Sequence, residues 1–421
     1  MTQYILRRLL LMIPTFLGIT ILVFTILQLV PGGPLEQELL KAQASLMAGG
    51  EGGAGGSTSQ SGSIELPEES VARLKAFYGL DRPGPIRYLV WLGVWPKEIN
   101  QYHVKFAGDN TDESHRLSSK NYLQVKLENG IPTVQAREGK TEKWKAEVTL
   151  TDENSGEITV KIYQTAFQGI LTGNLGTSYN YAEPVWQLIK DRLHVSAYFG
   201  LISFFLSYMV CIPLGISKAL KHGSKYDAIT SVIVFVGYST PGFILGAVLL
   251  VYFGGGSFWD VFPLGEFRSE DFEYFTFWEQ VKDQLHHTIL PVISYMVAAF
   301  ATLTVLMKNS LLENLSQDYV RTAFAKGLSE RRVVFFHTVR NSLIPLATGI
   351  GGLLGVWLAG SYLIERVFNI NGIGMLSYMA VIQRDYPIVM GFLVVGTVIR
   401  LLGNLVSDMA YAAIDPRIRF K

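Results

Sequence analysis

The chain has 421 residues, of which 49% are hydrophobic and 17% are charged, and its mean hydropathy is +0.27. Soluble domains carry about a quarter charged residues, so this composition excludes a disordered chain and a single soluble globule. The 36 basic and 35 acidic residues leave a net charge of +1, so no overall field favours nucleic acid as a partner. The single cysteine, Cys211, excludes an intrachain disulfide.

Six long segments are nearly free of charge, and each reaches the roughly 20 apolar residues that a helix needs to cross a bilayer. They cover residues 9–30, 194–217, 228–253, 288–307, 343–364 and 387–414. Arg7 and Arg8 before the first segment would suit a signal peptide, but the apolar run is too long and no A-x-A cleavage pattern follows. We therefore expect a retained first helix and an all-α polytopic membrane protein with six transmembrane helices.

Basic residues mark the ends of these segments that the positive-inside rule assigns to the cytoplasm. They precede span 1, connect spans 2 and 3 and spans 4 and 5, and follow span 6: Arg7, Arg8, Lys218, Lys221, Lys225, Arg321, Lys326, Arg331, Arg332, Arg340, Arg417, Arg419 and Lys421. The connection between spans 3 and 4 is acidic instead. This distribution predicts that both termini lie inside.

The connection between the first two spans runs from residue 31 to about 192 and is expected outside the membrane. Residues 49–63 are rich in Gly and Ser, which is typical of a flexible linker, and an amphipathic helix is predicted over 68–78. Residues 97–164 alternate apolar and polar side chains around Asn-Gly and Asn-Ser-Gly turns, which predicts a small antiparallel sheet. This part is either a binding module or a tolerated loop insertion.

Residues 316–332, with the sequence SQDYVRTAFAKGLSERR, carry the strongest functional signal. Asp318 is expected to cap a short helix. The apolar side chains of this helix fall on one face, at Tyr319, Val320, Ala323 and Phe324. Gly327 is expected to end the helix in the left-handed conformation, and a second helix is predicted from Ser329. The segment either rests on lipid head groups or docks a soluble partner.

Arg321-Thr-Ala followed by Gly327, with Pro345 further on, resembles the EAA-type coupling loop of ABC-importer permeases in its peptide-transporter version. Other motifs in chain order resemble the same family: Tyr4-Ile-Leu-Arg-Arg8, Pro31-Gly-Gly-Pro34, Gly173-Asn-Leu-Gly176, Ile212-Pro-Leu-Gly215, Glu365-x-Val-Phe368, Arg384-Asp-Tyr-Pro387 and Asp415-Pro-Arg-Ile-Arg419. The chain therefore resembles the oligopeptide and dipeptide binding-protein-dependent permeases, and specifically a Yej-like B-type subunit. His194 and Asn371 depart from the family pattern, which often has Pro at both positions.

The resemblance implies a multi-pass permease of the cytoplasmic (inner) membrane that translocates peptides or peptide-like solutes. Its implied partners are a second permease subunit, two ABC ATPase subunits, an extracytoplasmic substrate-binding protein and membrane lipid, with no nucleic acid. ATP and Mg are expected on the ATPases, because this chain lacks the phosphate-binding G-x4-GK[ST] loop. We expect no catalytic residue, cofactor or metal in this chain. The alternatives are an intramembrane protease and an ATP-independent channel.

The apolar spans, the alternating segment and the resemblance together divide the chain into four parts. These are transmembrane helix 1 in residues 1–31, an extracytoplasmic linker and short helix in 32–96, a small β-rich extracytoplasmic insertion module in 97–165, and a permease core in 166–421 that holds transmembrane helices 2–6 and the coupling loop 309–342. The coupling loop is expected to insert into a groove on an ATPase, with its apolar face as the anchor. The residues expected to couple to the ATPase are Tyr319, Val320, Arg321, Thr322, Ala323, Phe324, Lys326 and Gly327.

Two residues in the predicted spans are candidates for the substrate path. Arg400 is a charge deep in the sixth span, where a charged group costs about 2.5–3.5 kcal/mol on insertion scales. It either binds the carboxylate of a peptide or pairs with a neighbouring group. Tyr238 precedes Pro241, which is expected to kink the third span. Small residues in the fifth span indicate a moving or dimer-forming interface, or static packing: Gly351, Gly355 and Ala359.

Overall fold

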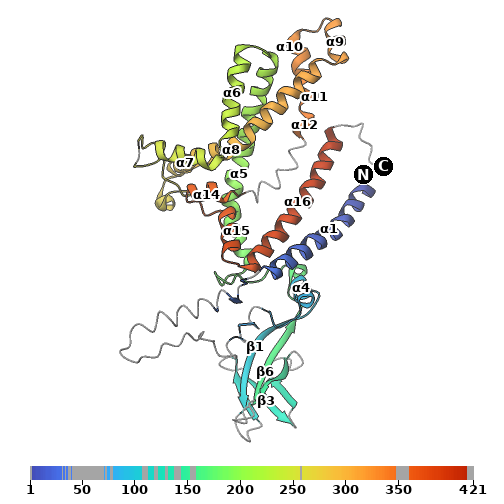
Figure 1. Ribbon diagram of the computed structural model, residues 1–421, viewed down its shortest axis with the longest axis vertical. Coiled ribbons are helices and arrows are strands. Elements are labelled where there is room, and N and C mark those ends of the chain that lie inside the picture. The colour runs from blue at the N-terminus through green and yellow to red at the C-terminus, as the bar shows by residue number, and fades with distance from the viewer. Residues whose placement is uncertain are drawn as a thin grey trace, which may run out of the picture. The chain divides into compact units, whose positions relative to one another are not determined.

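The computed structural model (Figure 1) describes residues 2–30, 79–106, 112–117, 122–128, 131–136, 144–151, 158–256, 258–347 and 360–414, with a few single residues between 32 and 75. The chain divides into two compact units, one of Met1–Val23 with Gly176–Lys421 and the other of Phe24–Leu175. Several predicted features lie wholly or mostly outside the described residues: the linker over 49–63, the helix over 68–78, the Asn129-Gly130 turn, and the small residues Gly351, Gly355 and Ala359.

The first unit is built from helices. In chain order these are α1 (Thr2–Leu29, which continues into the second unit), α5 (Val185–Leu220), α6 (Lys225–Ser239), α7 (Gly242–Phe253), α8 (Phe277–Leu315), α9 (Asp318–Ala325), α10 (Glu330–Arg332), a π-helical turn (Val333–Thr338), α11 (Val339–Ser342), α12 (Ile344–Ala347), α14 (Tyr362–Val367), α15 (Ile373–Ile382) and α16 (Tyr386–Ile414). A short 3-10 turn covers Glu270–Tyr274, and a second one, Ile170–Thr172, belongs to the other unit.

Three of these helices are long and apolar enough to cross a membrane: α1, α5 and α16. Among the described residues this number rises to five if two bent pairs are each one span, namely α6 with α7 and the two parts of α8. The predicted fifth span, 343–364, lies mostly outside the described residues. The chain is therefore a membrane protein with several apolar helices.

The predicted third span, 228–253, is a broken helix. The first half, α6, ends at Ser239, and α7 begins after Pro241 with a bend of 98°. Proline has no N–H group and disfavours helical geometry in the residue before it, so Thr240 is extended and the helix breaks here. The second half packs tightly, because a Cβ at Gly246 would lie 2.9 Å from the ring of Phe368.

The centre of this unit is the long contact between α5 and α8. Small and polar side chains of α5 are buried, at Ser196, Ser203, Ser207, Cys211 and Gly215, and the Cys211 thiol lies 3.5 Å from the Phe300 carbonyl of α8. At one end the backbones approach so closely that a Cβ on Gly215 would lie 2.6 Å from the Cβ of Met307. Small residues allow this approach, as in other membrane helix pairs, where lipid supplies no hydrophobic drive.

Two buried carboxylates fasten parts of the chain that are distant in sequence. Glu365 accepts hydrogen bonds from the Ser196 hydroxyl at 3.0 Å and from the Met375 N–H at 2.6 Å. Asp385 accepts from the Ser178 hydroxyl at 2.5 Å and from the Asn180 N–H at 3.1 Å. Buried polar groups need such partners, so Glu365 joins α14 to α5 and α15, and Asp385 joins the connection between α15 and α16 to the segment before α5.

The second unit contains α4 (Gly84–Leu92) and six strands. The strands are β1 (Lys97–Phe106), β2 (Asp112–Arg116), β3 (Tyr122–Glu128), β4 (Ile131–Ala136), β5 (Trp144–Thr151) and β6 (Ile158–Ala166). They form two antiparallel three-stranded sheets with the orders β1-β6-β5 and β2-β3-β4. One core lies between them, contributed by every second residue of three strands: Val104, Phe106, Leu123, Val125, Val160 and Ile162. This module therefore has a hydrophobic core of its own.

Candidate functional site

The candidate site is the segment between α8 and α12, which folds as two short helical arms. The first arm, α9, begins one residue earlier than a cap at Asp318 requires, because Gln317 occupies the N-cap position and Asp318 is the first helical residue. The prediction that Asp318 caps this helix is therefore wrong. Its carboxylate lies 3.6 Å from Arg321, and both side chains are exposed, so this pair adds little stability.

Gly327 joins the two arms. Its φ of +78° is left-handed, and its N–H donates to the Phe324 carbonyl at 2.9 Å, so the predicted left-handed helix end is confirmed. A Cβ at this position would have nothing within 4 Å. The backbone angle, rather than crowding, therefore requires glycine here.

The second arm begins after Ser329 and continues through α10, the π-helical turn and α11 to Ser342. Within the π-helical turn the Thr338 hydroxyl donates to the Val333 carbonyl at 3.1 Å. Such turns are rare and are often found at functional sites.

The expected single apolar face of α9 is divided in the structure. Val320 is 2% exposed and Ala323 is 8% exposed, and both pack against the fully buried Val333 of the second arm. Tyr319 and Phe324 are 38% and 46% exposed. The inner pair therefore holds the two arms together, and only the outer pair is available to a partner. The polar residues Arg321, Thr322 and Lys326 are also exposed.

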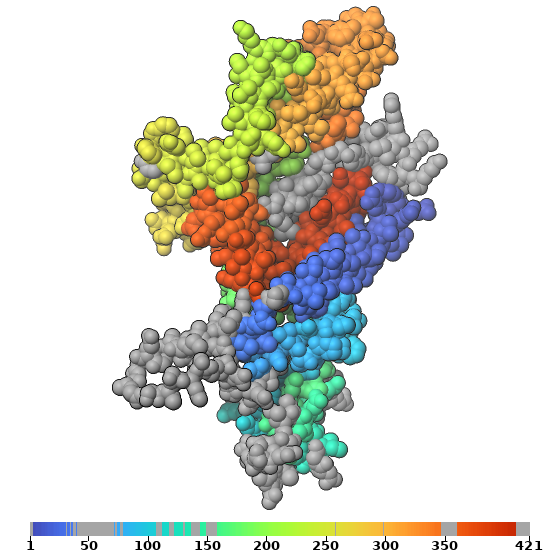
Figure 2. All heavy atoms as spheres, in the orientation of Figure 1, coloured from blue at the N-terminus to red at the C-terminus, as the bar shows by residue number. Residues whose placement is uncertain are grey.

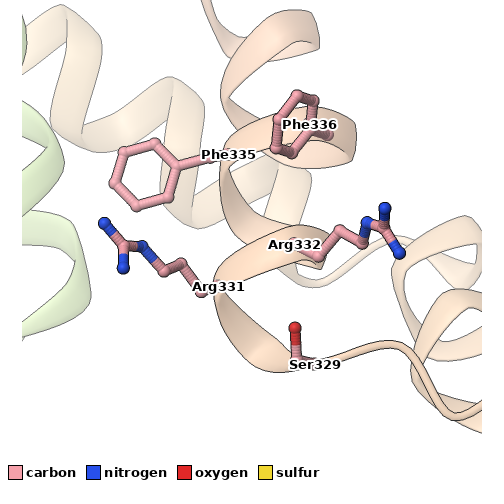
Figure 3. A pocket seen from close by; sticks show the side chains of 5 residues that line it. All are labelled: Ser329, Arg331, Arg332, Phe335 and Phe336. Atoms are coloured by element: carbon pink, nitrogen blue, oxygen red, sulfur yellow. The ribbon is translucent and has the colours of Figure 1, made fainter.

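Sequence reasoning missed a hollow in the second arm. It measures about 440 Å³ and is lined by Ser329, Arg331, Arg332, Phe335 and Phe336. Figure 3 shows each arginine extending beneath a phenylalanine on its own side of the helix, with Ser329 below them where the helix begins. Phe336 is 72% exposed, which is unusual for a large apolar side chain in a basic segment. The adjacent pairs Arg331-Arg332 and Phe335-Phe336 are the sequence signal for this surface.

The second arm is anchored firmly to the helical bundle. Val334 and Val339 are buried with Met307 and Leu311 of α8 and with Ala219 of α5. Below them, Ser310 and Ser342 exchange hydrogen bonds, each hydroxyl donating to the carbonyl of the other residue at 3.0 and 3.3 Å. A displacement of this segment is therefore transmitted to α8 and α5, because packed side chains resist separation.

The two candidates for the substrate path lie on different helices, Arg400 on α16 and Tyr238 at the end of α6. Both side chains are exposed, and Arg400 has no hydrogen bond or ion pair with any described residue. Asp408, on the same helix, is paired with Arg8 of α1 at 2.9 Å. In the part of the chain that the structure describes, His, Cys, Asp and Glu form no group of three that could hold a metal ion.

Comparisons with known proteins identify the class. Residues 211–420 match the family of binding-protein-dependent transport system inner membrane components. The chain is 35% identical to the peptidoglycan transport system permease protein YejB of Agrobacterium fabrum, over 100% of this chain and 99% of that protein. It is 33% identical to the inner membrane ABC transporter permease protein YejB of Escherichia coli O157:H7 and 28% identical to the dipeptide transport system permease protein DppB of Escherichia coli K12, over 100% of both chains in each case.

The chain belongs to the family of binding-protein-dependent transport system inner membrane components. It is a multi-pass protein of the cytoplasmic membrane and the permease subunit of an ABC importer, so it is a transporter and not itself an enzyme. Importers of this family also contain ATPase and substrate-binding components. The comparisons give no support to an intramembrane protease or an ATP-independent channel.

Proposed function

We propose that this permease moves peptides or peptide-like solutes inward, paired with a second permease and served by two ATPases and an extracytoplasmic binding protein. The observation that carries the proposal is full-length similarity to permeases whose names specify peptidoglycan and dipeptide transport. Peptidoglycan and dipeptides share amide-linked amino acids, so a peptide-like cargo is the chemistry common to these relatives.

The proposed topology has six spans with both termini inside. The basic ends of the apolar segments support it, and α6 with α7 would form one broken span. Residues 32–96 and 97–165 would then lie outside as a linker and a β-rich module, between transmembrane helix 1 and the core of residues 166–421. A broken helix near the middle of a membrane exposes backbone polar groups, which is a common design of transport pathways.

We propose that the coupling loop 309–342 docks on an ATPase through its exposed side chains. Tyr319 and Phe324 of the first arm and the arginine–phenylalanine hollow of the second supply aromatic anchors and positive charge, the features of binding hot spots. Val320, Ala323 and Gly327 act on the ATPase indirectly, because they set the angle between the arms. Arg321, Thr322 and Lys326 would surround the aromatic anchors as a polar rim.

The mechanism follows from the way this segment is attached. When ATP draws the two ATPases together, each docked segment is displaced. The displacement reaches α8 and α5 through the buried contacts of Val334 and Val339. The helical bundle has one arrangement open to the cytoplasm and another open to the outside. ATP binding and hydrolysis then shift the population from one arrangement to the other.

The test is uptake into proteoliposomes that contain the whole complex, with radiolabelled tri-alanine or the peptidoglycan tripeptide as the probe. ATP-dependent accumulation is expected with the unaltered chain. Ala323→Glu forces a charge between Val320 and Val333 and should abolish uptake and ATPase retention, whereas the matched Ala323→Ser should preserve both. Failure of both probes to accumulate would overturn the peptide assignment, and ATPase retention by Ala323→Glu would overturn the docking site.

A further inference from the structure

A buried group of charges joins three helices outside the docking segment. Asp227 lies in the first turn of α6 and is 6% exposed. Lys308 of α8 donates to both of its carboxylate oxygens at 2.8 Å, and Lys218 in the last turn of α5 lies 3.2 Å from one of them. The Gly223 N–H donates at 3.3 Å, and the His222 ring lies at 3.3 Å.

Lys218 is held by more than this carboxylate. Its ammonium group donates to the Asp227 carbonyl at 3.1 Å, the Thr230 hydroxyl at 2.9 Å and the Ser231 hydroxyl at 2.7 Å. Its side chain is 2% exposed. Lys218 therefore ties α5 to α6, which are neighbours in sequence, whereas Lys308 is the charged link from that pair of helices to α8. Separating a buried ion pair leaves an uncompensated charge, so this link resists opening.

Among the described residues, few apolar side chains of α6 are buried. Two of its residues are buried, Asp227 and Val234, whereas most of its large apolar side chains are exposed. Figure 2 shows α6 in yellow-green directly beside the orange end of α8. Asp227 thus supplies the charged link from α6, the first half of the broken helix, to α8.

Lys308 lies on α8 directly before the docking segment, residues 309–342. Its neighbour in sequence, Met307, is fully buried against the cluster that holds Val334 and Val339. Any displacement of the second arm that moves Met307 must therefore move Lys308. The chain of contacts is continuous from the docking segment through α8 to Asp227.

We propose that Asp227 is a positioning residue that latches α6 to α8, so that the broken helix follows the docking segment when the ATPases close. The proposal rests on the proposed docking function and adds the route by which that movement reaches the helix α6. It predicts that a complex without the Lys308–Asp227 ion pair still binds its ATPases but no longer couples ATP hydrolysis to transport.

Lys308→Met is the decisive variant, because it removes the link to α8 and leaves the Lys218–Asp227 pair intact, so the fold is preserved. Asp227→Asn is harsher, since it leaves two buried ammonium groups without a carboxylate. Lys225→Met is the matched control, because Lys225 is an exposed lysine two residues from Asp227. All are made in the complete complex with its ATPases and binding protein.

Two measurements are needed. The first is the distance between spin labels on α6 and α8, at Val232→Cys and Val305→Cys in a Cys211→Ala background, without nucleotide and after trapping with ATP and vanadate. The second is the stimulation of ATP hydrolysis by the binding protein. We expect Lys308→Met to broaden the distance distribution about twofold and to reduce the stimulation about tenfold, with ATPase content unchanged.

Lys225→Met should match the unaltered complex in both measurements. If Lys308→Met also matches it, in distance distribution and in stimulation, the latch is refuted while docking stands. If the ATPases are absent from the unaltered complex, docking is refuted and the latch with it. If Lys308→Met loses the ATPases, the role of the charge group is structural and the latch is refuted.

Discussion

Truncating Phe324 tests the division of the first arm into an inner and an outer pair of apolar residues. Phe324 is 46% exposed, so the isolated permease loses little when it becomes alanine. A phenylalanine buries roughly 200 Å² in an interface, so docking removes roughly 90 Å² of this side chain from water. At about 25 cal/mol per Å² this area contributes about 2 kcal/mol, and Phe324→Ala should weaken ATPase binding about 30-fold.

The assay is a titration of the purified permease in nanodiscs with its ATPase subunits, followed by interferometry. Thermal unfolding of the same samples should be unchanged. Phe205→Ala is the control, since Phe205 is 59% exposed on α5, away from the docking segment, and should not alter ATPase affinity. Val320→Ala should lower stability by about 1.5 kcal/mol, because two buried methyl groups are lost, and should weaken ATPase binding less than Phe324→Ala, because it alters only the packing between the arms. Unchanged affinity in Phe324→Ala would refute the outward anchor.

Three other outcomes are expected. Gly327→Val should strain the left-handed turn by about 1–2 kcal/mol and reduce ATPase binding, whereas Gly327→Asn should be tolerated; equal binding by both variants would contradict the role of the backbone angle. Glu365→Ala should lower stability by about 2–3 kcal/mol in thermal unfolding, because the Ser196 hydroxyl and buried N–H groups lose their acceptor, with partial recovery in Glu365→Gln. Arg400→Gln should impair uptake of the labelled tripeptide and leave assembly intact, with Arg400→Lys retaining more uptake; loss of assembly would indicate a structural role instead.

Hydropathy and local turn chemistry were enough to predict several elements of the fold. The apolar run of residues 9–30 is long enough to span a membrane as a single helix, and α1 covers it in the structure. Gly327 was expected to be left-handed from its position after a short helix, and its φ of +78° agrees. Such features depend on neighbours in the chain, so local sequence is sufficient to specify them.

Other features could not be predicted, because they depend on contacts between distant residues. Helical spacing put Val320 and Phe324 on one apolar face, but only the packing of the second arm decides that Val320 is buried and Phe324 is not. Likewise, Pro241 predicts a kink, but neither the angle of 98° nor the contact of Gly246 with Phe368, more than a hundred residues away, can be read from local sequence.

The amino-acid order alone was sufficient to predict a membrane-embedded permease with a basic segment between two apolar runs, because apolar length, charge and motif spacing are properties of contiguous residues. It could not indicate that Lys218, Asp227 and Lys308 form one buried group. That group exists only because tertiary packing brings the ends of α5, α6 and α8 to one place, where charges removed from water must pair with each other.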